Sequence, residues 1–297
     1  MTQDLDSLKI NFDSEGLWVL NIALAIIMFG VALGITKHDF IRLLKTPRIL
    51  FTGVVSQFFI LPLVTFFFVK ITNPMPSIAL GLFMVAACPG GNISNFISHF
   101  AKGNAALSVS LTAVATLLSM VMTPFNFHFW ANLHEPTAEL LKTVSLDPWK
   151  LVELVALLLG VPLVLGMYFR AKNEKLAIKI SNWLKPFSLV VFLILIGAAL
   201  SKNWDILLNY VKFVAALVII HNILAILTGF SFAKLMKLNF KDQKTLAIET
   251  GIQNAGLGLL LIFSFFEGLG GMALLVAFWA IWDIFSGLAL GWYWSKK

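Results

Sequence analysis

Residues 88–95 read Cys-Pro-Gly-Gly-Asn-Ile-Ser-Asn, and residues 249–256 read Glu-Thr-Gly-Ile-Gln-Asn-Ala-Gly. Each stretch lies inside an apolar run that is long enough to cross a membrane. Proline removes a backbone donor and glycine loosens a helix, so both stretches predict helices that are interrupted near their middle. An ordinary kink explains either stretch taken alone. The two together favour a site, because backbone leaves a helix at membrane depth only where protein buries it or where it lines a cavity.

The composition around these stretches is that of an integral membrane protein. Of 297 residues, 59% are apolar and 12% are charged, whereas soluble domains carry about 25% charged residues. The net charge of +7 does not indicate a nucleic-acid partner, because the basic residues sit in short connectors between apolar runs. A span needs about 20 apolar residues, and the chain offers nine candidates. They are 17–36, 48–70, 77–99, 105–126, 149–170, 184–201, 207–234, 245–265 and 272–294.

The distribution of lysine and arginine predicts the orientation in the membrane. Alternate connectors, together with the C-terminal tail, hold 16 of the 22 basic residues, and the opposite set holds 6. The side richer in basic residues is normally cytoplasmic. We therefore expect a multi-pass protein of the cytoplasmic membrane with its N-terminus outside and its C-terminus inside.

The interrupted spans are the third and the eighth, so they run in opposite directions. Opposed, broken helices in matching positions of two halves are typical of the inverted repeat of a secondary transporter. In such folds the N-termini of half-helices face anionic groups of the substrate, and unwound carbonyls coordinate cations. The sequence contains no phosphate-binding loop, zinc-ligand spacing or nucleophile elbow, so we do not expect an enzyme.

Glu249 lies well inside a predicted span, where a charge costs roughly 2.5–3.5 kcal/mol. No lysine or arginine is expected at a comparable depth, so a bound metal cation is its natural partner. A protonated, hydrogen-bonded acid is the alternative. Oxygen-bearing side chains suited to a hard ion occur at Ser94, Asn95, Ser108, Thr112, Gln57 and Gln253. For Ser108 and Thr112, which share a helix face, packing of small residues is the competing explanation.

Asp283 is the other carboxylate well inside a span. The sequence leaves four roles open for it: a second cation ligand, a proton site, a group facing the substrate, or a neutral structural residue.

Four motifs identify a family resemblance. They are Cys-Pro-Gly-Gly-Asn-Ile-Ser-Asn (88–95), Lys-Gly-Asn (102–104), Leu-Ser-Val-Ser-Leu-Thr (107–112) and Ile-Glu-Thr-Gly-Ile-Gln-Asn (248–254). At these spacings the chain, from about Asn21 onward, resembles the bile acid:sodium symporter family.

The resemblance implies one transporter domain over residues 1–297 with two parts. A core (spans at about 48–126 and 207–294) would hold two crossing discontinuous helices. A panel (17–36, 149–170 and 184–201) would lie beside it. Two Na⁺ ions would be the coupling ions, and an organic anion would be the substrate.

The resemblance also implies three groups of site residues. The first sodium site would be Ser94, Asn95, Ser108, Thr112 and Glu249. The second would be Gln57, Glu249 and Gln253 with backbone carbonyls around Thr250 and Ile252. Substrate would bind at Gly91, Asn92 and Asn254, and we add Asp283 as a candidate beside them.

Some features depart from the bacterial pattern of the family. Well-studied bacterial members have ten spans with an extra N-terminal helix, whereas the nine expected here are similar to the vertebrate carriers. Asn92 and Thr250 also look like the vertebrate residues. Asp283 stands where a bacterial relative has histidine, and an extra acid near the cavity disfavours a bile acid as substrate unless it is protonated or turned away.

These observations predict a sodium-coupled importer of an amphipathic organic anion, either bile acid-like or a small carboxylate or sulfonate, working by alternating access in the lipid bilayer. Proton coupling through Glu249 or Asp283 is the nearer alternative. A passive channel or a lipid-handling scaffold is the more distant one.

Overall fold

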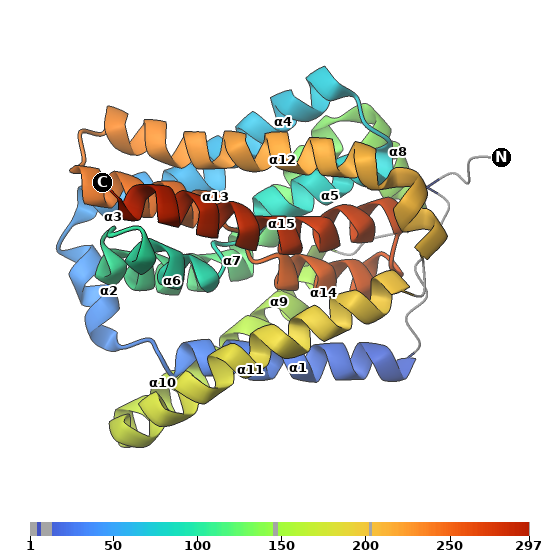
Figure 1. Ribbon diagram of the computed structural model, residues 1–297. Coiled ribbons are helices and arrows are strands. Elements are labelled where there is room, and N and C mark those ends of the chain that lie inside the picture. Colours follow the sequence, from blue (N-terminus) through green and yellow to red (C-terminus); the bar gives the residue numbers. More distant parts are fainter. Residues whose placement is uncertain (1–4, 7–13, 145–147, 202–203, 297) are drawn as a thin grey trace.

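The computed structural model describes residues 5–6, 14–144, 148–201 and 204–296, and this part of the chain is almost entirely helical (Figure 1). Lys9, Lys202 and Lys297, which enter the charge count, lie outside the described residues. The first helices are α1 (Ser14–Ala32), α2 (Lys37–Leu44), α3 (Pro47–Val55), η1 (Ser56–Ile60), α4 (Leu61–Thr72), α5 (Pro76–Ala87), α6 (Ile93–Phe100) and α7 (Ala105–Leu133). The remaining helices are α8 (Glu135–Val144), α9 (Pro148–Val155), η2 (Ala156–Gly160), α10 (Val161–Lys172), α11 (Glu174–Ser201), α12 (Trp204–Leu235), α13 (Phe240–Gly251), α14 (Ala255–Phe265) and α15 (Gly270–Ser295).

The helices follow the predicted apolar segments. Within the described residues, five helical stretches are long and apolar enough to cross a membrane: Pro47–Thr72, Ala105–Leu133, Trp149–Lys172, Tyr210–Leu235 and Gly270–Ser295. The two stretches quoted at the start do break their helices, since α5 ends before α6 begins and α13 ends before α14 begins. Together these features show an all-α membrane protein.

The structure adds helix where the apolar pattern indicated connectors. α8 occupies part of the expected loop 127–148, and α11 begins at Glu174 rather than near residue 184. The side-chain carbonyl of Asn173 accepts from Leu176 N at 3.1 Å, so it caps the first turn of α11. A capped, acidic first turn stabilises a helix without being apolar, and a hydropathy pattern therefore misses it.

Two short π-helical stretches, η1 and η2, each precede a proline, Pro62 and Pro162 respectively. Proline cannot donate to the carbonyl four residues earlier and crowds it. For Pro62 that carbonyl belongs to Phe58, and it accepts instead from Asn126 Nδ2 of α7 at 3.0 Å. The widened turn contains Gln57, so the distortion sits directly at a predicted site residue.

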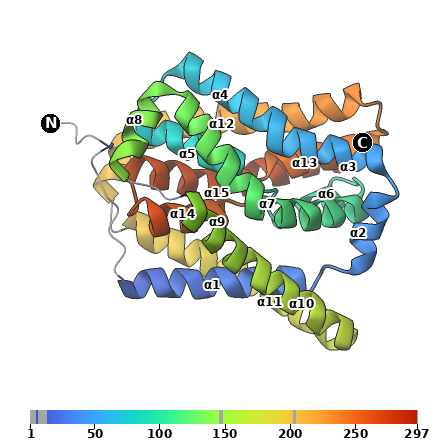
Figure 2. The ribbon, with the colours of Figure 1, turned by 180° about the vertical axis from the view of Figure 1, so that it is seen from behind.

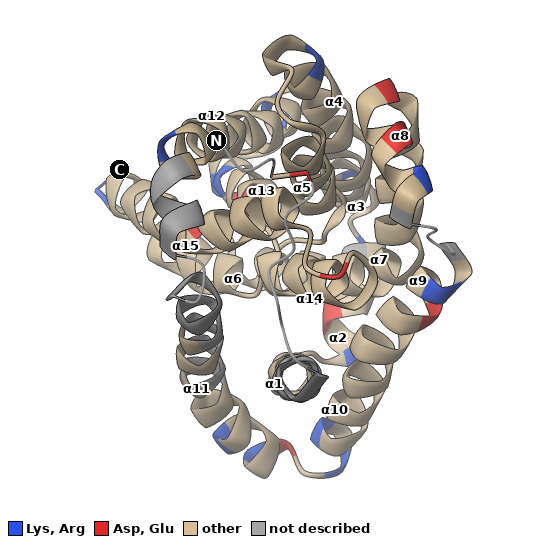
Figure 3. Ribbon diagram, turned by 90° about the vertical axis from the view of Figure 1, so that its right-hand side faces the viewer, with Lys and Arg blue, Asp and Glu red and all other residues tan. Residues whose placement is uncertain are grey.

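α1, α10 and α11 pack against one another along the lower edge of the molecule in Figures 1 and 2. Hydrogen bonds reinforce this group, because Arg170 Nη1 donates to Leu33 O at 2.8 Å and Ser181 Oγ donates to Gly30 O at 2.9 Å. The helices with the broken segments lie above it. The start of α1 and the end of α15 are at opposite ends of the bundle. Charged residues gather near helix ends and connectors, as Figure 3 shows, with long uncharged stretches between them.

Candidate functional site

The two interrupted segments lie alongside each other in the middle of the bundle. Gly91 N donates to Ile252 O at 2.7 Å, and Asn254 N donates to Pro89 O at 2.8 Å. An antiparallel bridge pairs Gly90 with Gln253. Each broken helix thus satisfies backbone groups of the other, which is what a membrane interior requires of non-helical backbone.

Two glycines make this close approach possible. A Cβ on Gly90 would lie 2.8 Å from Glu249 O, and a Cβ on Gly91 would lie 2.7 Å from Gln253 O. Side-chain carbons do not approach backbone oxygens so closely, so any larger residue would push the segments apart.

Side chains from neighbouring helices occupy the carbonyls that the broken helices leave free. Thr123 Oγ1 of α7 donates to Ala87 O at 2.7 Å, at the end of α5. Asn222 Nδ2 of α12 donates to Gly251 O at 2.8 Å, at the end of α13. The sequence offered no sign of the role of Thr123, because a threonine in an apolar span looks like any small packing residue. The mid-span position of Asn222 was visible, but its partner was not.

The carboxylate of Glu249 is the centre of the polar cluster beside this crossing. Its side chain is buried near the end of α13. One oxygen, Oε2, accepts from Ser94 Oγ at 2.6 Å and from Ser108 Oγ at 2.9 Å. The other, Oε1, accepts from Thr112 Oγ1 at 2.5 Å. In the described part of the chain, the groups hydrogen-bonded to this carboxylate are these hydroxyls and no ammonium or guanidinium group.

The Thr112 hydroxyl lies near more acceptor oxygens than its single proton can hydrogen-bond. Its hydroxyl lies 2.5 Å from Glu249 Oε1, 3.0 Å from Ser108 O and 3.2 Å from Asn95 Oδ1. One hydroxyl proton faces three acceptor oxygens, two of which belong to side chains. The structure therefore brings Ser94, Asn95, Ser108, Thr112 and Glu249 together, and the donor set fits a hard cation.

Gln57 belongs to a second polar group, and it lines the same small pocket as Glu249. Its Nε2 donates to Cys88 O at 2.9 Å and to Gln253 Oε1 at 2.8 Å. Its Oε1 is buried and has no hydrogen-bond partner. An unpartnered buried carbonyl oxygen is costly unless a proton donor or a cation reaches it.

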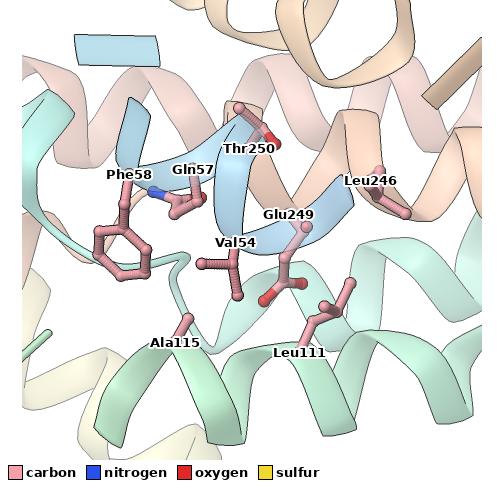
Figure 4. A pocket seen from close by; sticks show the side chains of 9 residues that line it. Val54, Gln57, Phe58, Leu111, Ala115, Leu246, Glu249 and Thr250 are labelled. Atoms are coloured by element: carbon pink, nitrogen blue, oxygen red, sulfur yellow. The ribbon is translucent and has the colours of Figure 1, made fainter. Parts of the chain in front are cut away.

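A small pocket opens at this second group (Figure 4). Its lining includes Gln57, Glu249 and Thr250, and it has room for about one water-sized sphere. The hydroxyls of Ser56 and Thr250 lie 2.9 Å apart, and Gln253 Nε2 donates to Thr250 O at 2.6 Å. Ile252 contributes its carbonyl to the crossing rather than to the pocket lining.

The predicted substrate residues gather at the crossing. Asn254 Oδ1 accepts from Leu257 N at 3.1 Å and caps α14, and Asn92 immediately precedes α6. Two half-helices thus begin at the crossing, and their N-termini carry partial positive charge. Asp283 is buried on α15, and this helix packs against α6 and α13, the helices on either side of the crossing.

The chain is similar to proteins of known families. A family model described as "Sodium Bile acid symporter family" matches residues 21–210. An uncharacterized sodium-dependent transporter of Bacillus subtilis, YocS, is 35% identical over 293 residues, which is 98% of this chain and 88% of that protein.

More distant similarities extend to plants and mammals. A probable sodium/metabolite cotransporter of Arabidopsis thaliana chloroplasts, BASS1, is 31% identical over a stretch that covers 82% of this chain and 58% of the length of BASS1. The ileal sodium/bile acid cotransporter of Mus musculus is 28% identical over a stretch that covers 80% of this chain and 67% of the length of that cotransporter.

Proposed function

The chain belongs to the sodium bile acid symporter family, and we propose that it is a secondary active symporter that couples the entry of Na⁺ to the import of an organic anion. The single observation that carries this proposal is the environment of Glu249. This residue is a buried carboxylate whose hydrogen-bond partners are hydroxyls from α6 and α7. The names of the proteins similar to this chain agree with the proposal, since they describe sodium-dependent transporters and cotransporters rather than enzymes.

We assign two Na⁺ ions to the two polar groups that share Glu249. The first ion is held by oxygens of Ser94, Asn95, Ser108, Thr112 and Glu249. The second lies in the pocket lined by Gln57, Glu249 and Thr250. The carbonyls of Thr250 and Ile252 and the side chain of Gln253 are its further proposed ligands, which the ion would draw from the hydrogen bonds that they make with Gln253, Gly91 and Gln57. Gln57 Oε1, buried without a partner, supports this second assignment.

The substrate anion docks where α6 and α14 begin. Their free N–H groups and partial positive charge attract a carboxylate or sulfonate, and Gly91, Asn92 and Asn254 lie at these ends. Bound sodium neutralises Glu249 and steadies the crossing before the anion arrives. Asp283 faces the same region and takes part in the choice of substrate.

Transport then follows from movement between two bodies. We assign the panel to α1, to the helices from α9 to α10 and to α11, and the core to the remaining spans. The proposed arrangement is nine crossings with an inverted repeat, with the N-terminus outside and the C-terminus in the cytoplasm. Motion of core against panel exposes the crossing to one side of the membrane at a time.

Purified protein in proteoliposomes tests the proposal. An inward Na⁺ gradient should drive uphill accumulation of at least one labelled anion from a panel that includes a bile acid and small carboxylates. Replacing Na⁺ with choline at fixed pH should abolish it. Accumulation driven in choline by a pH gradient would instead indicate proton coupling, and equilibration without accumulation would indicate a channel.

A further inference from the structure

A second polar cluster lies at the end of the molecule where α6, α7 and α13 meet. It includes the motif Lys-Gly-Asn (102–104), none of whose residues belongs to the proposed sodium or substrate sites. Asn104 N donates to Thr245 Oγ1 at 2.8 Å, and Asn104 Nδ2 donates to Asp242 Oδ1 at 2.8 Å. Asp242 and Thr245 are both buried. We call Asn104, Asp242, Lys244 and Thr245 the polar joint.

The polar joint lies one helical turn from the proposed cation site on two helices at once. Asn104 caps the start of α7 four residues before Ser108, and on α13 Glu249 follows Thr245 by four residues. Residues four apart on a helix lie above one another on the same face. The contact between Asn104 and Thr245 is therefore repeated one turn further along as the contact between Ser108 and Glu249.

Lys244 connects the third helix of the site. Its Nζ donates to Ala101 O at 3.0 Å, where α6 ends, and to Trp294 O at 3.1 Å, near the end of α15. A cation at the C-terminal end of a helix is stabilised by the free carbonyls there. Ser94 lies about two turns before Ala101 on α6. Lys244 therefore holds against α13 the helix that supplies the Ser94 hydroxyl to Glu249.

These contacts have one consequence in common. Glu249 meets hydroxyls from two other helices, and hydrogen bonds that form only at correct spacing require those helices to stay in register. We propose that the residues of the polar joint are positioning residues for the cation site, which keep α6 and α7 in register with α13 without touching the ion. This inference rests on the proposed function of Glu249.

Thr245→Val tests the joint with almost no change in volume. Sodium-22 binding to the purified protein is the readout, together with the melting temperature in NaCl and in choline chloride. We expect the Na⁺ concentration for half-maximal binding to rise about three- to tenfold, because outer-shell hydrogen bonds orient first-shell ligands. The melting temperature in choline chloride should stay close to that of the unchanged protein. The separate variant Thr245→Ser, which keeps the hydroxyl, should bind sodium with normal affinity.

Thr52→Val is the matched control. Thr52 is also buried, and its hydroxyl donates to Arg48 O one turn back at 2.7 Å, as Thr245 does to Lys241 O at 3.1 Å. We expect normal sodium affinity for this variant. Lys244→Met, which keeps the apolar stem, should weaken sodium binding in the same direction. If Thr245→Val does not fold, the sodium affinity of Lys244→Met tests the positioning role instead.

Glu249→Gln separates failure of this inference from failure of the proposed function. If Glu249→Gln loses sodium binding and the joint variants keep normal affinity, the positioning role is wrong and the proposed function stands. If Glu249→Gln binds sodium normally, the cation site itself is wrong. A lower melting temperature in choline with unchanged sodium affinity would reduce the joint to a purely structural contact.

Discussion

At the scale of single residues, the site is organised around a carboxylate that accepts hydrogen bonds from hydroxyl groups, where an ion pair with a basic side chain would be expected. Glu249 sits where an isolated charge costs several kcal/mol, and its partners Ser94, Ser108 and Thr112 are neutral. Neutral donors stabilise a carboxylate without cancelling its charge. The negative charge therefore stays available to a mobile cation, whereas a lysine partner would occupy it permanently.

Glu249→Gln should abolish sodium-dependent uptake while leaving the protein folded, because glutamine keeps the shape and removes the charge. Uptake in proteoliposomes across a range of NaCl concentrations measures this. Glu153→Gln, at an exposed carboxylate of α9, is the control and should transport normally. Normal sodium dependence in Glu249→Gln would remove Glu249 from both sodium sites.

Gln57→Leu should separate the two sodium sites. Leucine fills a similar volume but lacks the buried, unpartnered Oε1 that we assign to the second ion. We expect the dependence of uptake on Na⁺ concentration to change from sigmoidal to hyperbolic, with the Hill coefficient falling toward one. A coefficient that stays unchanged in Gln57→Leu would contradict the second site.

Asp283→Asn should lower the KM for the anionic substrate about threefold or more at saturating Na⁺. The substitution keeps the size of the side chain and removes a charge of the same sign as the substrate. Initial uptake rates at varied substrate concentration give the measurement. A higher KM would show instead that the Asp283 carboxyl group holds the substrate.

At the scale of elements, two helices give up regularity where they cross, and other elements satisfy the groups this frees. Thr123 and Asn222 bond the last carbonyls of α5 and α13, and the segments exchange backbone hydrogen bonds with each other. The turn η1 belongs to the same arrangement, because Pro62 disrupts its helix and Gln57 emerges from the widened turn. Irregular backbone is thus concentrated where we propose that the ions and the substrate bind.

Gly91→Ala should abolish transport with little loss of folded protein, because its Cβ would lie 2.7 Å from Gln253 O and force the segments apart. Overpacking of this kind costs about 1–3 kcal/mol. Gly160→Ala is the control, since its Cβ would meet only the flexible end of Met120, at 3.2 Å. Uptake and size-exclusion profiles of both variants would decide it; full activity in Gly91→Ala would show that the crossing can widen.

At the scale of the whole molecule, basic and acidic residues occupy different places: basic residues lie mostly in connectors at the ends of the bundle, and two acidic residues are buried inside it. Lysine and arginine are concentrated in one set of connectors, and buried carboxylates occur at Glu249 and Asp283. With the two Na⁺ ions per monoanion that we propose, each transport cycle would carry one net positive charge inward. Each charge gains about 2.3 kcal/mol per 100 mV of membrane potential.

Transport should therefore respond to voltage. A potassium diffusion potential that makes the inside of proteoliposomes negative should raise sodium-driven accumulation of a monoanion, by up to about 50-fold at 100 mV. Labelled substrate in vesicles with and without valinomycin provides the measurement. Accumulation that ignores the potential would mean one sodium ion per anion.

The sequence by itself determined the class of the protein, its apolar segments, the place of both breaks and the family. These features are local or compositional: a proline with paired glycines weakens a helix wherever it stands, and a run of apolar side chains partitions into lipid by its own free energy. The oxygen-bearing residues around Glu249 were also visible, because polar groups are conspicuous in an apolar span.

The family resemblance grouped the residues of the first site in advance, but only the tertiary structure shows which atoms of these residues meet. Ser94, Ser108 and Thr112 reach Glu249 across separations of 155, 141 and 137 residues in the chain. Thr123, Asn222, the turn η1 and the polar joint gain their roles through partners on other helices. Such partnerships depend on helix packing and register, which arise from the sum of many contacts, so no local pattern of residues records them.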